Sequence, residues 1–201
     1  MSTLKVDTIL KRTGTGTIAV GQSGDTVAMP SATLTTALPV ASGGTGGTSF
    51  SAAGLANTPS FIATKTSNQT GVSDNTFTKV TWDNVVNDSN SGFSTSDNRY
   101  TVPSGQGGIY QISFTNYMGG ASASFNYHQT RLYKNGSHLS PYSIEYNDDG
   151  FNTEAYNPCM SLCVSLAAGD YIEVYGRLDV NSGNVTIAGE NVFTGFKLVG
   201  A

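Results

Sequence analysis

The sequence predicts an all-β protein whose carboxy-terminal two-thirds form an antiparallel sandwich. No stretch of the 201 residues keeps a helical period, whereas short alternating apolar runs recur from residue 60 onward. Turn-forming residues separate these runs, and the clearest are Asn135-Gly136, which favour the tight turn of a β-hairpin. Many short strands at this spacing are typical of a sandwich or jelly roll.

The run that starts at Gly108 shows the strand pattern best. Its large apolar residues alternate with its other residues, as Tyr110, Ile112 and Phe114 against Ile109, Gln111 and Ser113. Side chains of a strand point alternately to its two faces, so this strand is expected to be half-buried, with one aromatic and aliphatic face.

Similar patterns predict ten strands between residues 61 and 199. Turns are expected at 168–170 and 181–184, where Gly occurs with Asp or Asn. In chain order the predicted strands are Phe61–Lys65, Thr76–Trp82, Arg99–Val102, Gly108–Asn116, Phe125–Lys134, His138–Ile144, Asn157–Leu166, Tyr171–Leu178, Asn184–Ile187 and Asn191–Val199.

Composition divides the chain into two parts. Residues 1–59 contain a single aromatic residue, Phe50, so only residues 60–201 can build an ordinary core. We expect residues 1–59 to form an extended, β-rich stalk and anchor that includes a flexible or tightly turned connector at Gly43–Gly47. If three copies ran side by side, their aliphatic residues would meet along a shared axis, and disorder is the alternative.

Charge and hydropathy exclude several functions. The net charge is −4 and the 10 basic residues are scattered, which argues against nucleic-acid binding. No apolar run reaches the ~18 residues of a membrane span, and the opening residues lack the layout of an export signal. We therefore expect assembly in a cytoplasm, where Cys159 and Cys163 remain free thiols. They lie four positions apart on one predicted strand, too far to pair with each other, and a bond between chains is the alternative.

Catalytic and metal sites are not expected. His128 and His138 lie outside any nucleophile or ligand motif, and Asp148-Asp149-Gly150 is more typical of a solvated turn than of a calcium loop. We predict a protein that is not an enzyme and that needs no cofactor or metal. Cleavage of surface polysaccharide is a less favoured alternative, because the scattered acidic residues form no recognisable pair.

Aromatic residues are the best candidates for binding. Tyr mixed with Asn, Ser and Gly is typical of adaptable recognition surfaces. The candidate receptor-facing residues are Tyr117, Phe125, Tyr142, Tyr146, Phe151 and Tyr156, and Tyr127 lies among them. Burial in the core or in a subunit interface is the alternative for these rings, and it is the expected role of Tyr110, Phe114, Phe193 and Phe196.

Several ordered blocks of residues 60–201 resemble the head domain shared by the complement globular heads and tumour necrosis factor. They are Thr78–Asn87, Arg99–Pro103, Gly108–Phe114, Arg131–Gly136, Ala168–Val174 and Phe193–Leu198. The resemblance implies a jelly-roll head that assembles as a homotrimer. A fold does not fix a function, so no complement-like role follows from it.

Two short motifs in residues 1–59 resemble parts of bacteriophage proteins. The Gly-Gly-Thr-Gly run before Ala52 and Leu55 is similar to a collar element of tail fibres, and residues 2–9 resemble the start of many virion appendage proteins. The resemblance implies a trimeric tail fibre or spike whose anchor, with Leu4, Val6 and Ile9, binds other virion proteins. Its head would bind a host-surface glycan or protein, and a capsid head fibre or decoration protein is the alternative.

Overall fold

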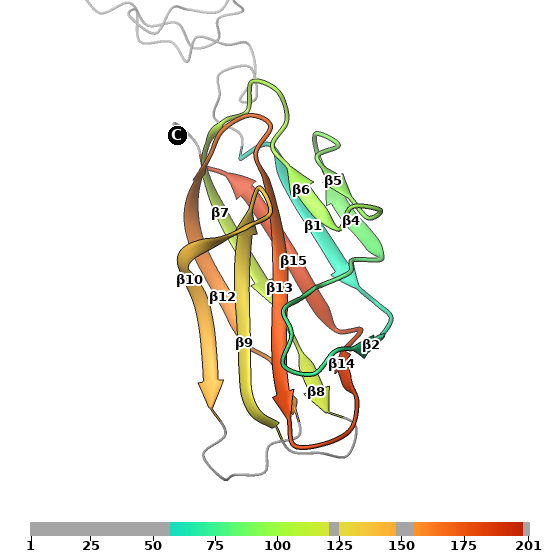
Figure 1. Cartoon of the computed structure of the whole chain (residues 1–201). Helices are drawn as coiled ribbons and strands as arrows, with labels where there is room; N and C mark the ends of the chain where they lie inside the picture. The colour runs from blue at the N-terminus through green and yellow to red at the C-terminus, as the bar shows by residue number, and fades with distance from the viewer. Residues whose placement is uncertain (1–56, 121–124, 148–154, 199–201) are drawn as a thin grey trace, which may run out of the picture.

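The computed structural model describes residues 57–120, 125–147 and 155–198. The predicted anchor residues Leu4, Val6 and Ile9, the Gly43–Gly47 connector, the Asp148–Gly150 turn and Phe151 lie outside these ranges. All regular elements of the described part are β-strands, which pair in antiparallel fashion into two large layers that face each other (Figure 1). No helix long and apolar enough to cross a membrane occurs in the described ranges.

A five-stranded sheet forms one layer, and in it the first strand of the head pairs with the last. Strand β1 pairs with β15, so that Ile62 lies opposite Thr194, and β15 in turn pairs with β7. The order across the sheet is β12 (Cys159–Leu166), β7 (Gly108–Thr115), β15 (Asn191–Lys197), β1 (Ser60–Lys65) and β4 (Asn84–Asp88).

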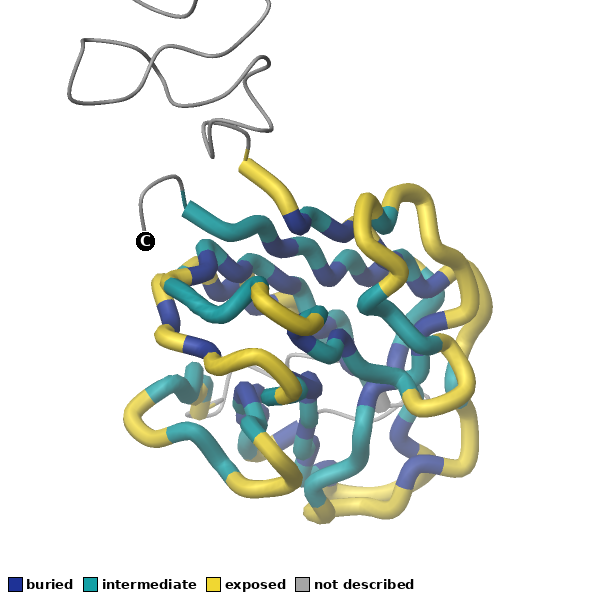
Figure 2. Tube along the Cα trace, turned by 90° about the horizontal axis from the view of Figure 1, so that it is seen from above, coloured by how far each residue is buried: buried dark blue, intermediate teal, exposed yellow. Residues whose placement is uncertain are grey.

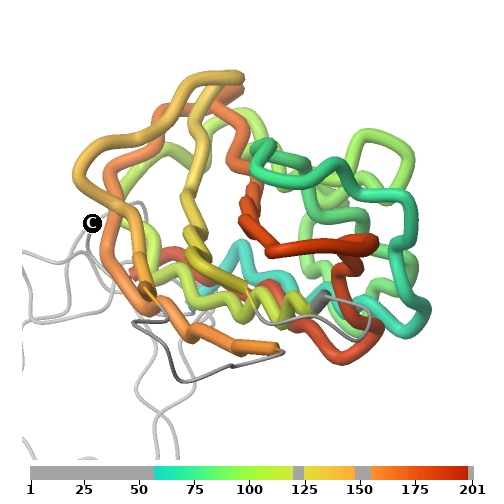
Figure 3. Tube along the Cα trace, turned by 60° about the horizontal axis from the view of Figure 1, so that its bottom comes forward, coloured from blue at the N-terminus to red at the C-terminus, as the bar shows by residue number. Residues whose placement is uncertain are grey.

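A six-stranded sheet forms the other layer, and a small sheet closes one end of the sandwich. The six-stranded sheet contains β10 (Ser137–Asn147), β9 (Phe125–Lys134), β13 (Tyr171–Val180), β6 (Arg99–Thr101), β5 (Phe93–Ser94) and, paired to β13, β3 (Thr78–Lys79). The small sheet contains β11 (Ala155–Tyr156), β8 (Met118–Gly120), β14 (Val185–Ile187) and β2 (Gln69–Val72). Figure 3 turns the end with β8 and β14 toward the viewer.

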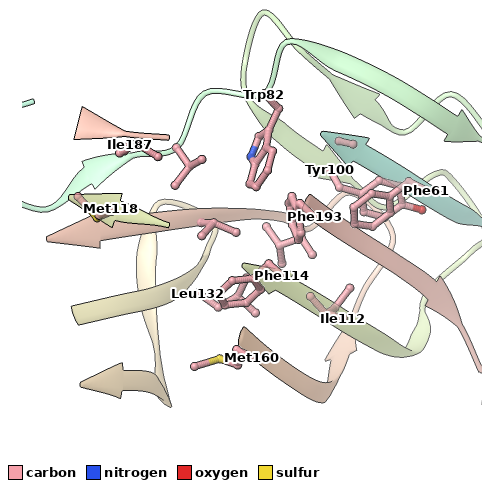
Figure 4. Close-up of a cluster of buried hydrophobic side chains, with 14 of the residues drawn as sticks. Phe61, Trp82, Tyr100, Ile112, Phe114, Met118, Leu132, Met160, Ile187 and Phe193 are labelled. Carbon is pink, nitrogen blue, oxygen red and sulfur yellow. The ribbon is translucent and has the colours of Figure 1, made fainter. Parts of the chain in front are cut away.

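The core lies between the two large sheets and is mainly aromatic. Phe193 is fully buried, and its ring centroid lies 5.0 Å from that of Phe61, 5.5 Å from Trp82 and 6.2 Å from Phe114 (Figure 4). Gly195 follows on the same face, where a Cβ atom would lie 2.6 Å from Cε1 of Phe61. The glycine is therefore required for the close approach of the Phe61 ring.

The structure confirms the alternation predicted for residues 108–116. In β7, Tyr110, Ile112 and Phe114 are buried, whereas Ile109 is 41% exposed. Buried residues run along the strands and exposed ones gather in the connections (Figure 2). The predicted Asn135-Gly136 hairpin joins β9 to β10, and both of its residues have positive φ.

Each predicted strand has a counterpart, but one is much shorter than expected. The strand predicted at Thr76–Trp82 is reduced to β3, because side chains take the place of a neighbouring strand after Val80, whose N–H still donates to the Val174 carbonyl of β13 (2.9 Å). The backbone N–H of Thr81 donates to Gln69 Oε1 (3.0 Å), and that of Trp82 donates to Asn98 Oδ1 (2.7 Å). Strands β2, β4, β5, β8 and β11 were not predicted, since each is short or lacks an alternating pattern.

Candidate binding surfaces

The outer side of the five-stranded sheet carries no charged side chain on four neighbouring strands. We call the residues that point outward here the uncharged face. They are Ser60, Ile62 and Thr64 of β1, Val192, Thr194 and Phe196 of β15, Ile109, Gln111, Ser113 and Thr115 of β7, and Cys159, Ser161, Cys163 and Ser165 of β12. Such a composition is unusual for a surface that water covers, because charged residues are normally exposed.

The polar groups of the uncharged face bond to one another across the strands. Gln111 Nε2 donates to Ser161 Oγ (2.8 Å), Ser161 Oγ lies 2.8 Å from Ser113 Oγ, and Cys163 Sγ donates to Gln111 Oε1 (3.1 Å). These groups already have partners, so covering them removes little hydrogen bonding to water. Cys159 and Cys163 are exposed free thiols.

Large exposed apolar side chains concentrate on the same sheet. Within the described ranges, the exposed large hydrophobic residues are Ile62, Val85, Val86 and Ile109, which belong to β1, β4 and β7. Val86, in edge strand β4, is 61% exposed. Ile62 and Ile109 therefore add exposed apolar surface to the uncharged face, whereas Val85 and Val86 lie on its edge strand, which also carries Asp88.

Four predicted interface or core aromatics separate into two groups. Tyr110, Phe114 and Phe193 point inward and are buried, so they are core residues and cannot contact another chain. Phe196 lies three positions after Phe193 in β15 and therefore points outward, onto the uncharged face. Of these four rings, only Phe196 lies on an outer surface of the sandwich.

Three of the predicted receptor-facing residues meet in one cluster of rings. Tyr146 stacks on Tyr156 at 4.5 Å, Phe125 lies 5.7 Å from Tyr146, and His128 lies 5.7 Å from Tyr156. Phe125 is only 1% exposed, so the prediction that it faces a receptor is wrong. Its ring packs into the end of the core, and Tyr146 and Tyr156 pack partly against it.

The other predicted receptor-facing residues lie elsewhere. Tyr142 is half-buried in β10, and its hydroxyl donates to the Cys163 carbonyl of the facing sheet at 3.3 Å. Tyr117 lies between β7 and β8, where its backbone N–H donates to Asn191 Oδ1. The five predicted residues that the structure describes thus do not form one continuous surface, and Phe151 lies outside the described ranges.

A buried polar group of β9 supports the ring cluster. His128 is 1% exposed, and its Nε2 lies 3.4 Å from Thr130 Oγ1, which accepts a hydrogen bond from Asn116 Nδ2 (2.8 Å). Burial disfavours the charged imidazolium and lowers the pKa of His128 to about 4. A neutral histidine held in this way is structural, and among described residues no group of three His, Cys, Asp or Glu side chains could hold a metal.

Sequence reasoning missed the outer side of the six-stranded sheet. Tyr133 of β9 and Tyr175 of β13 stack there at 4.0 Å, and Lys79 forms an ion pair with Glu173 (2.5 Å). The available signal was the alternation of Tyr127, Gln129, Arg131 and Tyr133 along one predicted strand, which places four polar or aromatic side chains on one face.

Solved structures of similar shape were found, and one of them, murine APRIL, supports the jelly-roll assignment. The globular domain of zebrafish complement 1qA protein matches 70% of this chain and 97% of its own, with 17% identity and a TM-score of 0.49. Murine APRIL matches 69% of this chain and 98% of its own, with 12% identity and a TM-score of 0.50. At these identities the likeness to APRIL concerns the fold alone. No family model and no curated protein matches the sequence.

Proposed function

We propose that this chain, a jelly roll of the complement-head and tumour-necrosis-factor type, is the non-enzymatic binding head of a homotrimeric bacteriophage virion appendage. The uncharged face is the observation that supports trimer formation. It combines exposed apolar residues with polar groups that already bond to one another. A subunit that covered this face would therefore bury apolar area and displace few hydrogen bonds to water.

The virion role is supported by the motifs of residues 1–59 and not by the head. These motifs resemble the collar element of tail fibres and the first residues of virion appendage proteins. The resemblance favours an anchor that binds other virion proteins and a head that binds the host surface, with a glycan as the simplest ligand. Imaging of intact particles tests this role. We expect labelled chain at the tail, whereas label on the capsid would identify a decoration protein and no label would reject both.

A lysine in the centre of the uncharged face is expected to abolish trimer formation. Thr194 lies between Ile62 and Ser113 in the sheet, so Thr194→Lys would bury an unpaired charge in the contact. We expect light scattering to give three times the 20.9 kDa chain mass for the wild type, and one chain mass for the variant. Association should weaken by about a hundred-fold or more.

Thr95→Lys provides the control, because Thr95 is an exposed loop residue outside the five-stranded sheet. This variant should remain trimeric. A wild-type protein that is monomeric at micromolar concentration, or a Thr194→Lys variant that stays trimeric, would contradict the proposed assembly.

A further inference from the structure

We propose that the outer side of the six-stranded sheet carries a site for a carboxylate-bearing sugar, built from Phe77, Arg131 and Arg177. The inference rests on the glycan-binding part of the proposed function and names the ligand class. It arises from two arginine side chains that share one aromatic ring and have no acidic partner in the described part of the chain.

The two arginines reach the same ring from neighbouring strands. Arg131 of β9 pairs with Tyr175 of β13, and Arg177 lies two residues further along β13, so both side chains point to the same side of the sheet. Phe77 directly precedes β3, which pairs with β13. The central guanidinium carbon lies 4.2 Å from the Phe77 ring centroid for Arg131 and 5.0 Å for Arg177.

This arrangement holds two positive charges close together without an ion pair. The ion pairs in the described ranges involve Lys79, Arg99 and Lys134, and none involves Arg131 or Arg177. The Nε atoms of both arginines are buried and lack a hydrogen-bond partner. Like charges repel each other, so an anion bound between them would be stabilised by both.

The acidic side chains of this sheet face have other partners. Glu173 pairs with Lys79, Glu145 accepts a hydrogen bond from the Tyr127 hydroxyl, and Asp179 Oδ2 accepts one from Asn75 Nδ2 (3.4 Å). Among the residues that the structure describes, these contacts leave the two guanidinium groups as positive charge available to a ligand.

Groups beside the arginines suit a sugar better than a simple anion. The Tyr127 ring lies 4.7 Å from the Arg177 guanidinium carbon. The half-buried Tyr175 lies between Arg131 and Lys79 across the sheet, two residues before Arg177 in β13. Tyrosine rings pack well against the apolar face of a sugar. Gln129, 3% exposed and opposite Arg177, has an Oε1 atom without a partner, which a sugar hydroxyl would satisfy.

A carboxylate is the anion that this geometry favours. A planar guanidinium group offers parallel N–H donors that match the two carboxylate oxygens. A long polyanion such as a nucleic acid would need more clustered basic residues than this chain of net charge −4 provides. The expected ligand is therefore a uronic-acid or sialic-acid unit of a surface polysaccharide.

The test measures binding of oligosaccharides that contain glucuronate, galacturonate or sialic acid, each beside its carboxyl-reduced form, by calorimetry on the full chain. At least one acidic oligosaccharide should bind the wild type, and its reduced form should bind at least about ten-fold more weakly. Arg131→Gln and Arg177→Gln should each weaken binding by a similar factor, and the double variant should abolish it.

Arg99→Gln is the matched control, because the Arg99 guanidinium carbon also lies over a ring, that of Tyr171 at 4.3 Å, but has Asp97 nearby. This variant should bind like the wild type. Thermal unfolding checks that the variants fold. Arg177→Lys keeps the positive charge but loses the parallel N–H donors of the guanidinium group, so it should bind with intermediate affinity.

The site would be overturned if no acidic oligosaccharide binds, if inorganic phosphate binds while acidic sugars do not, or if the arginine variants bind like the wild type. Binding of acidic and reduced forms with equal affinity would also reject it, yet would leave the proposed glycan-binding role intact. Loss of all glycan binding together with absence from the particle would instead reject the proposed function.

Discussion

Phe193→Ala is expected to lower the free energy of unfolding of the head by about 3–5 kcal/mol, the usual cost of removing a buried aromatic ring. Phe193 lies at the centre of the aromatic core, in contact with Phe61, Trp82 and Phe114. The cavity would remain open because rings from both sheets surround it and cannot collapse together. Urea unfolding followed by tryptophan fluorescence measures the loss, since Trp82 is the single tryptophan and lies beside the cavity.

Phe196→Ala is the matched control for this prediction. It removes the same ring from the same strand, three residues later and on the opposite side of the sheet. Its effect should be small in the monomer and should grow with protein concentration, because the ring would be buried only in the trimer. Equal and concentration-independent losses for the two variants would show that Phe196 belongs to the core, contrary to the structure.

Acidification is expected to lower the free energy of unfolding by about 3 kcal/mol through His128 alone. The reason is that the pKa of His128 is 6.5 in the unfolded chain and about 4 in the folded one. Because the folded pKa is the lower one, the unfolded chain binds the proton first. The contribution of His128 is therefore complete above pH 6.5, declines as the pH falls toward 4, and changes no further below that value.

Urea unfolding at several pH values between 7 and 4 measures this slope, and His128→Gln should remove most of it. His138→Gln is the control, because His138 is half-buried on the other side of the sheet, beside Tyr133. Asp170 does not contribute to the slope in this pH range. Hydrogen bonds from Lys134 and Asn135 lower the pKa of its carboxyl to about 2, so its contribution is lost only as the pH falls below 3.8. A slope unchanged by His128→Gln would contradict the structural role of the buried imidazole.

Local patterns predicted the strands because each depends on neighbouring residues. Alternation in residues 108–116 placed Tyr110 and Phe114 on the buried side, and Asn135-Gly136 placed a hairpin where the backbone needs positive φ. The pattern failed where a strand is held by distant partners. Strand β4 is exposed along most of its length and exists through its pairing with β1, which no local feature of Asn84–Asp88 reveals.

The candidate surfaces were much less predictable than the strands. Phe125 appeared suited to a receptor because polar residues surround it in the sequence, yet it packs against His128 and Tyr146. Phe77, Arg131 and Arg177 are far apart in the chain, and only the pairing of β9, β13 and β3 brings them to one place. A site made by strand pairing leaves no spacing motif in the sequence.

By itself, the sequence determined that the chain is all-β, where its longer strands lie and where its main turns occur, because alternation and turn chemistry act over a few residues. Tertiary structure alone decided how the two sheets face each other and what each outer surface carries. It placed Phe193 in the core and Phe196 outside, left one sheet face without charge, and set two arginines against one ring. Those outcomes depend on which strands become neighbours, and that choice is made by the packing of the whole sandwich.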